Sequence, residues 1–527
     1  MNRSTITFGV LIEDVAMPKW QAEMIDHLIA SPHVDVHYLM TIRGKKSVSE
    51  TASWGGVPWV SGTVVTDVHL TNDTMKWLKE HPVDVLLSLG KWRWQGAIID
   101  FPAYGVWGFR HQWEKVPFFQ HYRERNSESE VMLARLFHDE DYQSLKVGYR
   151  HMHPFSRRRH QRAMEEGVVE WPAQAAKDIL INGYPDSIVV STVYDDPKVA
   201  DRLHVVLSQT KHLGKEVLKK AFAYEYWNVG FSNQDLSSIS QEGVSLRFLK
   251  EGKHHYYADP FFYNDGENWR IIAEEMDHHE PNGFISEWVM RDGDEPTEYK
   301  RTLSQPHHMS YPYIVHHDGT TYCIPETSEA KSVVLYQWSG HWKVVKTMLH
   351  DFAAVDATVT YYDDQWWMFC TKASGGNSHN EELHVFYADD LLGDWKEHPL
   401  NPVKVDVRSS RSAGTPFVME ESLYRPSQDC SRTYGGAVVI NRIVALSSEQ
   451  FREEPAYRLE PDPLSDYPDG LHTVSFVNGV ALMDGKRIEY HGKHLLRKIH
   501  RFLLARAKRM KKREQTLKEK PSDAFFS

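Results

Sequence analysis

Cysteine is scarce in this chain of 527 residues, which has only Cys323, Cys370 and Cys430. Three thiols cannot all pair, and no two of them have the short spacing of a zinc-binding Cys pair. This scarcity excludes a disulfide framework and a cysteine-based zinc cluster, and it favours a reducing compartment. The 30 histidines also lack a metal-ligand spacing, so the sequence predicts no metal site.

Long apolar runs are absent as well. No segment reaches the roughly 18 consecutive apolar residues that a membrane-spanning helix needs. The N-terminus, MNRSTITFGVLIEDVAM, is interrupted by Glu13 and Asp14, so it resembles the first strand of a domain and not a signal peptide. These two absences predict a cytoplasmic protein.

Basic charge is rare except at the end of the chain. The net charge is −11, but residues 486–520 contain 14 Lys/Arg and 3 Asp/Glu. We predict that residues 486–527 form a basic helical tail with one apolar face, made of Leu495, Ile499, Phe502, Leu503 and Met510. Such a helix either lies on the anionic inner face of a membrane or packs its apolar face on its own protein. No nucleic-acid partner is expected, because no reader motif accompanies the tail.

The first 215 residues alternate apolar strands with helices. Strand-like segments rich in apolar residues occur at 6–12, 34–40 and 83–90, and helical patterns lie between them. Strands that are apolar throughout are typical of a parallel sheet covered on both faces. Residues 1–215 are therefore predicted to form a Rossmann-like α/β domain.

From residue 216 to 485 the helical period disappears, and a strand–turn–strand unit recurs about every 50 residues. Each copy has an apolar-aromatic strand, a tight polar turn and a second strand, and the copies lie at 258–275, 310–328, 356–373, 414–430 and 472–485. Five such units predict an all-β five-bladed propeller whose strands surround one central site. The high aromatic content is explained by packing between sheets or by stacking on sugars.

The segment 83–124 resembles the folate-dependent formyltransferase domain. In that family a strand ends in an Asn-x-His element and an Asp follows later. The resemblance places His111 at the histidine position and Asp139 or Asp141 at the Asp position, whereas Phe109 or Gly108 occupies the Asn position. It implies a tetrahydrofolate derivative as cofactor if this domain is active, and no other cofactor is expected.

The Ala-Asp-Pro element at 258–260 resembles the first-blade motif of five-bladed glycosidases of the family 43 and 32 type. The resemblance implies that Asp259 is the base or nucleophile and that Asp356 is the second central carboxylate. Glycosidic chemistry also needs an acid. The Glu that usually precedes Gly-Pro in a later blade is missing at Gly414-Thr415-Pro416, so Glu326 and Glu275 are the candidates.

A larger set of motifs, including ADPFF, SYPY, IPETS, DVRSSRSAG, YRPSQDCS and GLHTVS, resembles the propeller at the N-terminal end of plant glucosamine inositolphosphorylceramide transferases. Polar residues within these motifs suit a sugar or sugar-phosphate ligand, because Arg can bind phosphate bidentately and His can transfer protons. The alternative for each is that it braces loops between blades. The candidate binding residues are Arg408, Arg411, Arg425, Asp429, Asn441 and His472.

Together these features predict a carbohydrate-active protein of glycan or glycolipid biosynthesis that acts on a glycosyl bond at the propeller centre. Its partner would be a sugar, a sugar-phosphate or a lipid-linked glycan. Two alternatives remain: a non-catalytic glycan-binding module, and a formyltransferase that acts on an amino-sugar nucleotide.

Overall fold

The computed structural model divides into two compact units, Met1–Thr210 and Lys211–Ser527. It describes residues 4–42, 53–62, 64–66, 69–114, 116–138, 141–184, 189–190, 198–234, 245–252, 254–277, 279–290, 297–374, 378–477, 479–495, 498–499 and 503. No helix among these residues is both long and apolar enough to cross a membrane.

The first unit is built on a nine-stranded sheet with the order β11-β10-β9-β8-β7-β1-β2-β4-β3. Its central strand, β1 (Ile6–Ile12), pairs in parallel with β2 (Val34–Ile42) on one side and β7 (Val85–Ser88) on the other. Starting from β1, the strands β2 to β4 are added on one side of the sheet, and β7 to β11 are then added on the other side. The sequence predicted these three strands because β1 and β7 are almost wholly buried and the second half of β2 is buried on both faces.

Other elements of this unit surround or extend the parallel core. β8 (Val106–Phe109) pairs in parallel with β7, whereas β9 (Glu128–Leu136) and β10 (Tyr142–His151) extend the sheet antiparallel. The main helices are α1 (Lys19–Ala30), α2 (Asn72–Glu80), α5 (Arg157–Glu166) and α6 (Trp171–Asn182). A further helix, α7 (Val199–Phe222), begins in this unit and ends in the second. The shorter elements are β3 (Ser53–Trp54), β4 (Val57–Gly62), β5 (Val64–Thr66), β6 (His69–Leu70), α3 (Ala97–Asp100), η1 (Arg110–Trp113), α4 (Phe119–Glu124) and β11 (Val189–Val190). The α/β sheet is present, and the formyltransferase fold itself stays a prediction.

The second unit is a five-bladed propeller, as the repeat predicted. Blades I and II are regular four-stranded sheets. Blade I contains β14 (His255–Asn264), β15 (Trp269–Asp277), β16 (Phe284–Met290) and β17 (Thr297–Leu303). Blade II contains β18 (Ser310–His317), β19 (Thr320–Glu326), β20 (Ser332–Trp338) and β21 (Trp342–His350).

Blades III and IV have shorter strands at their edges. Blade III contains β22 (Ala354–Tyr362), β23 (Gln365–Lys372), β24 (Glu382–Ala388), β25 (Lys396–Glu397) and β26 (Lys404–Val405), the last paired with β24. Blade IV contains β27 (Phe417–Met419), β28 (Ser422–Asp429), β29 (Ala437–Leu446) and β30 (Phe451–Leu459). Two short helices, η3 (Ser328–Ala330) and α9 (Ser378–Glu381), lie in the connections.

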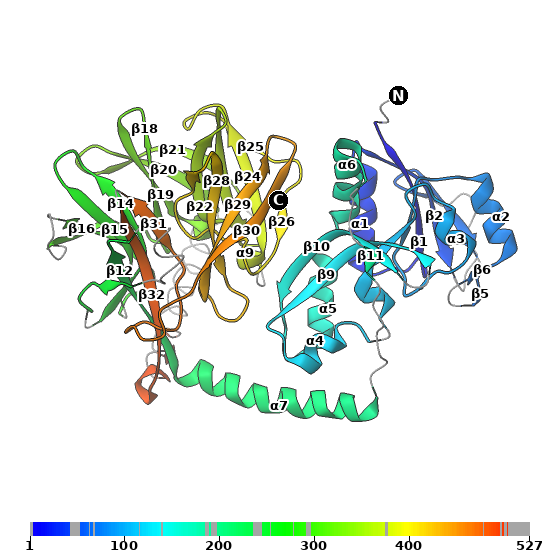
Figure 1. Ribbon diagram of the computed structural model, residues 1–527, viewed down its shortest axis with the longest axis horizontal. Coiled ribbons are helices and arrows are strands. Elements are labelled where there is room, and N and C mark those ends of the chain that lie inside the picture. The colour runs from blue at the N-terminus through cyan, green and yellow to red at the C-terminus, as the bar shows by residue number, and fades with distance from the viewer. Residues whose placement is uncertain are drawn as a thin grey trace, which may run out of the picture. The chain divides into compact units, whose positions relative to one another are not determined.

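Blade V is made from both ends of the propeller segment. β31 (Val474–Val477) and β32 (Val480–Tyr490) come last, and β32 pairs antiparallel with β12 (Ala223–Ser232), which comes first; β13 (Arg247–Phe248) adds the outer strand. Figure 1 shows these orange and green strands side by side. The predicted tail began at residue 486, but residues 486–490 belong to this strand, because Lys486 and Asp484 are buried within the blade.

Aromatic side chains fill the spaces between blades. Phe261 of blade I makes edge contacts with Tyr311 and Tyr313 of blade II, with ring centroids 5.0 and 5.5 Å apart. The three cysteines are buried and free. Packing therefore accounts for many of the aromatics that the sequence presented as candidates for sugar stacking.

Candidate functional site

The inner strands of blades I, II and III share one backbone irregularity. The pairing register shifts between Ala258 and Phe261, between Ser310 and Tyr313, and between Val355 and Thr358. The residue inside each shift has a positive φ: 52° at Asp259, 43° at Tyr311 and 51° at Asp356. A non-glycine residue pays on the order of 1–3 kcal/mol for such a conformation, and strain of this kind clusters at functional sites.

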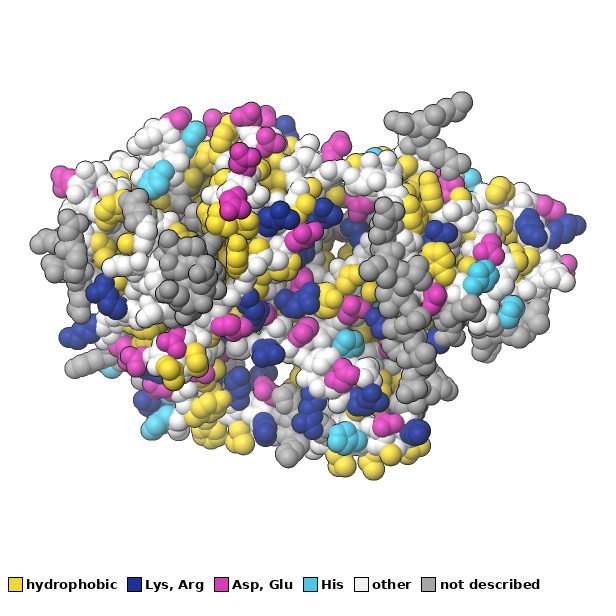
Figure 2. Space-filling model, in the orientation of Figure 1, with side chains coloured by type: hydrophobic (Ala, Val, Ile, Leu, Met, Phe, Trp, Pro, Cys, Tyr) yellow, Lys and Arg dark blue, Asp and Glu magenta, His cyan; other side chains and the backbone are white. Residues whose placement is uncertain are grey.

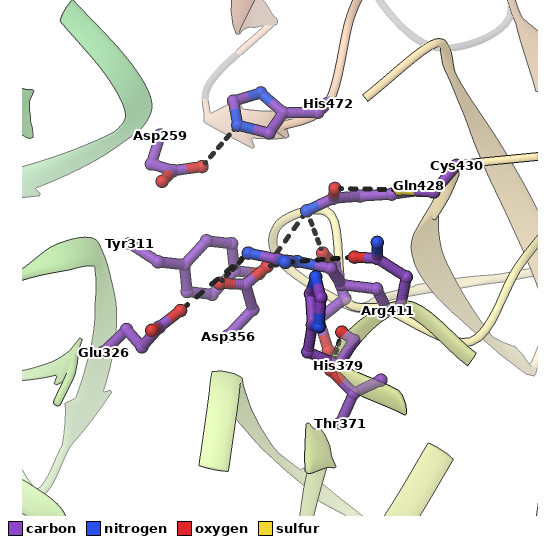
Figure 3. A network of polar contacts seen from close by, with 12 residues as sticks. Asp259, Tyr311, Glu326, Asp356, Thr371, His379, Arg411, Gln428, Cys430 and His472 are labelled. Carbon is purple, nitrogen blue, oxygen red and sulfur yellow. Dashed lines mark hydrogen bonds and ion pairs between the residues drawn. The ribbon is translucent and has the colours of Figure 1, made fainter. Parts of the chain in front are cut away.

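The three bulges bring side chains of different blades together (Figure 3). The Tyr311 hydroxyl contacts Thr358 Oγ1 of blade III at 2.9 Å and accepts a hydrogen bond from the backbone N–H of Gly414 at 2.7 Å. Gly414 precedes blade IV and has φ 122°, and an added Cβ would lie 1.7 Å from the Val474 carbonyl oxygen. Glycine is therefore required at position 414. This is the segment in which the sequence resemblance led us to expect a Glu.

Asp356 is held by a guanidinium and an amide. Arg411 Nε donates to Asp356 Oδ2 at 2.6 Å, its second amino group donates to Oδ1 at 3.3 Å, and Gln428 Nε2 donates to Oδ2 at 2.9 Å. The same guanidinium lies 3.8 Å from Glu326 Oε2. Arg411 therefore links the carboxylates of blades II and III, and the ring of Tyr434 covers it at 5.0 Å.

Asp259 is held by residues that precede β31. Thr473 Oγ1 donates to Asp259 Oδ1 at 2.7 Å, and His472 Nε2 lies 3.4 Å from the same oxygen. The other ring nitrogen of His472 lies 2.6 Å from Asp484 Oδ2. Asp484 also accepts hydrogen bonds from the backbone N–H groups of Asp259, His472 and Thr473. It therefore holds in place both Asp259 and the residues that contact it.

Glu274 joins these carboxylates, and the sequence analysis had not selected it. Burial raises its pKa well above the usual value, and the charges of Asp259, Glu326 and Asp356 raise it further, against the opposing effect of Arg411. Its ladder partner is Ala258, just before the bulge, and the ladder partner of Glu326 is Ser310, just before the bulge of blade II. Glu274 follows Asp259 by the same number of residues as Glu326 follows Tyr311, so alignment of the repeats could have identified it.

The pKa values of the other groups shift in the same direction. Burial raises the pKa of Asp356 to about 7, although Arg411 opposes the shift. Burial raises the pKa of Asp259 to about 6, although His472 opposes it. Burial alone would lower the pKa of His472, but the carboxylates of Asp484 and Asp259 raise it above the usual value. Near neutral pH this site therefore holds both protonated and ionised carboxyl groups, which is the requirement for general acid–base catalysis. We call Asp259, Glu274, Glu326, Asp356, Arg411 and His472 the acidic centre.

Three groups could hold a cation. Asp259, His472 and Asp484 each offer one ligand atom, and these atoms lie within 4.8 Å of one another. A cation there would compete with the proton of His472, because both need the same two carboxylates. The sequence-based expectation of no metal site remains a prediction.

Five residues predicted for the propeller site make other contacts. Glu275 accepts hydrogen bonds from Ser286 at 2.6 Å and Tyr299 at 2.8 Å, on the opposite face of β15 from Glu274. Arg408 binds Asp406 bidentately. Arg425 is fully buried, and it donates hydrogen bonds to Glu453 and to the backbone carbonyls of Ser409 and Ser410. Asp429 accepts a hydrogen bond from Arg458. Asn441 donates a hydrogen bond to Ser427. Of the six predicted binding residues, the structure brings Arg411 and His472 to the acidic centre.

In the first unit, His111 follows β8 at the carboxyl end of the parallel strands. It is buried, its two ring nitrogens have no hydrogen-bond partner among the described residues, and burial lowers its pKa to about 3. Glu165 Oε1 lies 3.9 Å from Nε2. Phe109 is buried against Trp20, and Asp141 lies in the turn between β9 and β10. Asp139 lies outside the described residues.

Comparison with protein families places the similarity in the propeller. Residues 248–461 match the family model described as glucosamine inositolphosphorylceramide transferase 1, N-terminal. This range covers blades I to IV. The glucosamine inositolphosphorylceramide transferase 1 of Oryza sativa subsp. japonica is 32% identical over 210 residues, which cover 38% of this chain and 28% of that protein. The Arabidopsis thaliana protein of the same name is 30% identical over 234 residues, which cover 42% of this chain and 29% of that protein. The chain thus matches less than a third of the length of these relatives.

Solved structures with a similar arrangement include glycoside hydrolases. A family 117 glycoside hydrolase from Zobellia galactanivorans has 14% identity and a TM-score of 0.33, and the match covers 49% of this chain and 90% of that chain. A family 43 β-1,3-galactosidase has 8% identity and a TM-score of 0.31, with 41% and 84% covered.

Proposed function

We propose that this protein acts on a glycosyl bond at the acidic centre, in the synthesis of a glycan or glycolipid. The observation that supports this most is the convergence of Asp259, Glu274, Glu326 and Asp356 on one buried point with Arg411. Carboxyl groups whose environments separate their pKa values are what glycosidic chemistry uses. The names of the relatives support a glycolipid as substrate.

In this proposal Glu274 is the acid, because burial and three neighbouring carboxylates raise its pKa well above the usual value. Asp259 is the base or nucleophile, since Thr473 and His472 both stabilise its ionised form. Asp356 positions Arg411, whose guanidinium is already occupied by Asp356, Glu326 and Asn380. An occupied guanidinium favours a neutral glycosyl group over a sugar-phosphate at this point.

The test is turnover of nucleotide sugars and lipid-linked or aryl glycosides by the full chain. Asp259→Asn and Glu274→Gln should each lower turnover by about 10²-fold or more, because general acid–base groups contribute about 10²–10⁴-fold. Glu454→Gln, an exposed change on blade IV, is the control and should leave turnover unaltered. Full activity in Asp259→Asn would refute the proposal.

A non-catalytic glycan-binding role is the second candidate. It is favoured by the burial of the centre, where Asp259 is 3% and Asp356 1% exposed. Ligand binding that survives in Asp259→Asn, with no turnover in the unaltered protein, would support it.

Formyl transfer in the first unit is the third candidate. The position of His111 after a parallel strand favours it, and the apolar Phe109 at the Asn position opposes it, because an oxyanion donor contributes about 2.7–4 kcal/mol. Binding of a tetrahydrofolate derivative by the full chain, lost in His111→Ala, is the measurement. If the full chain binds no tetrahydrofolate derivative, formyl transfer is excluded.

A cytoplasmic location, at the inner face of the membrane, is part of the proposal. The three buried free thiols support a reducing compartment.

A further inference from the structure

A pocket of about 230 Å³ lies between blade V and the start of blade I, outside the acidic centre. Its walls come from β12, the end of β32, the start of β14 and the segment before it. The residues that define it here are Tyr226, Glu251, Tyr256, Tyr467, Arg487 and Glu489, and we call it the tyrosine pocket.

The polar groups of the tyrosine pocket are fixed in place by one another. Arg487 donates to Glu251 at 2.8 Å and to Glu489 at 3.0 Å, and its guanidinium lies 5.0 Å from the ring centroid of Tyr467. Tyr467 donates to Glu251 at 2.5 Å and accepts a hydrogen bond from Asn228 at 3.1 Å. A ligand would therefore meet groups that need little further ordering, which lowers the cost of binding.

Trp227 lies between the pocket and the acidic centre, because it alternates with Tyr226 on β12 and its side chain faces the other side of the blade V sheet. Trp227 lines the pocket, and its ring centroid lies 4.0 Å from that of His472. Gly435, with φ 56°, passes so close that an added Cβ would lie 2.7 Å from both His472 and Trp227. The two sites thus share one wall.

We propose that the tyrosine pocket binds one pyranose-sized ring of a neutral or amino-bearing saccharide. The rings of Tyr226 and Tyr256 offer apolar surface to the C–H face of a sugar, and the fixed carboxylates of Glu251 and Glu489 accept hydrogen bonds from hydroxyl or ammonium groups. Arg487 is held by both carboxylates, and Lys493 also lines the pocket, so the lining carries both signs of charge.

The test titrates the full chain with methyl glycosides of glucose and glucosamine, followed by saturation-transfer NMR. Tyr226→Ala and Arg487→Met should weaken binding about tenfold, since one aromatic contact and one fixed polar group are lost. Tyr457→Ala, a change at a partly exposed tyrosine on blade IV, is the matched control. Equal binding by all variants, or no binding by the unaltered chain, would overturn the proposal.

Asp259→Asn separates this inference from the proposed function. If the pocket is correct, that variant binds the glycosides as the unaltered chain does, whether or not turnover exists. Loss of binding in Asp259→Asn with retention in Tyr226→Ala would place the sugar at the acidic centre alone and refute the pocket.

A second observation is independent of both sites. The part of α7 within the second unit exposes Leu213, Val217 and Leu218 at 44%, 57% and 59%. After β32 the chain exposes Leu495, Ile499 and Leu503 at 37%, 47% and 53%. Lys498 Nζ donates to the backbone carbonyls of Lys220 and Ala223, so the two apolar groups begin side by side. Exposed aliphatics on this scale mark an interaction surface.

The charge around these side chains is mainly positive. Residues 213–222 contain Lys215, Lys219 and Lys220 against Glu216, and residues 491–503 contain four Lys/Arg and no Asp/Glu. Figure 2 shows dark blue and yellow side chains interleaved along the lower edge, where Figure 1 places α7. Apolar side chains among lysines are complementary to an anionic lipid surface.

We infer that this face, formed by α7 and the segment after β32, docks on an anionic bilayer. Co-flotation of the full chain with vesicles of phosphatidylcholine and phosphatidylserine should exceed that with phosphatidylcholine alone and fall with salt. Val217→Glu with Leu218→Glu should reduce it about tenfold or more. The control pair, Val344→Glu with Val418→Glu, changes two valines that are each 59% exposed on other blades and should have no effect.

Two results would overturn the docking inference. The first is equal flotation with both vesicles or in all variants. The second is a change of oligomeric state in Val217→Glu/Leu218→Glu by light scattering, which would show that a second copy covers this face.

Discussion

The Nδ1 atom of His472 lies 2.6 Å from Oδ2 of Asp484, and both side chains are buried. Asp484 thereby sets the charge that His472 presents to Asp259 on the neighbouring blade. Loss of that carboxylate removes the main cause that raises the pKa of the imidazole.

Asp484→Asn should therefore lower the pKa of His472, because burial then acts against fewer opposing charges. If turnover depends on protonated His472, the alkaline limb of the rate profile should move to lower pH. The measurement is kcat/KM against pH for both proteins. A folded variant with an unchanged profile would show that His472 has no part in turnover.

Neighbouring carboxylates on β15 provide the next prediction. Glu274→Gln should abolish most turnover, because it removes the proposed proton donor. Glu275→Gln weakens contacts with Ser286 and Tyr299 and should lower the free energy of unfolding by about 1–3 kcal/mol, with the shape of the pH–rate profile kept. The reverse pattern of effects would assign the acid to Glu275.

Stability should fall as pH rises, because of Asp356. Its pKa is about 7 in the folded protein and near 3.8 when unfolded, so the native state retains a proton that the unfolded state has released. The stabilising contribution is complete below pH 3.8 and is lost as pH rises through 7. Urea unfolding of Asp356→Asn from pH 5 to 8 should show a smaller decline than the unaltered protein. An equal decline would contradict the raised pKa.

Arg425 should matter for stability and not for ligand binding. Arg425→Met leaves Glu453 buried with Lys404 as its remaining cation and should cost about 3–5 kcal/mol of unfolding free energy. Arg408→Met breaks a pair whose Arg is 39% exposed and should cost at most about 1 kcal/mol. Denaturant midpoints measure the stability of both variants. An equal loss of unfolding free energy in the two variants would show that burial of the ion pair does not determine its contribution.

Truncations test how the propeller closes. A chain that ends at Tyr490 keeps the whole of β32 and should unfold cooperatively. A chain that ends at Val477 lacks the strand that pairs with β12 and should be digested rapidly by protease. Resistance of the shorter chain would show that blade V does not close the ring.

Periodicity in the sequence was enough to predict the five-bladed propeller and the α/β character of the first unit, but not a formyltransferase fold. The strands at 6–12 and 34–40 are mainly apolar, and the five turn-linked units became the inner strand pairs of the five blades. The antiparallel strands β9 and β10 were not predicted, because their mixed polar pattern gives no clear period. The end of β32 was misplaced because the basic residues Lys486 and Arg487 resemble the start of the tail.

The site was predicted less completely, for a geometric reason. Asp259 and Asp356 follow from local motifs, but Glu274 and Glu275 differ only in which face of β15 they occupy. Asp484 carries no motif, and its role depends on backbone N–H groups that come from residues 259, 472 and 473. Contacts between blades are set by tertiary structure, so a linear pattern does not contain them.

The pairing of β12 with β32 has a consequence during synthesis. Asp484 lies on the last strand of the propeller, and Asp259 depends on it for its backbone contact. A nascent chain that has made Asp259, Glu274, Glu326 and Asp356 still has no assembled centre until the ribosome has released residue 484 and the strand that carries it. The acidic centre would therefore assemble in one step, late in translation, and a prematurely terminated product would lack it.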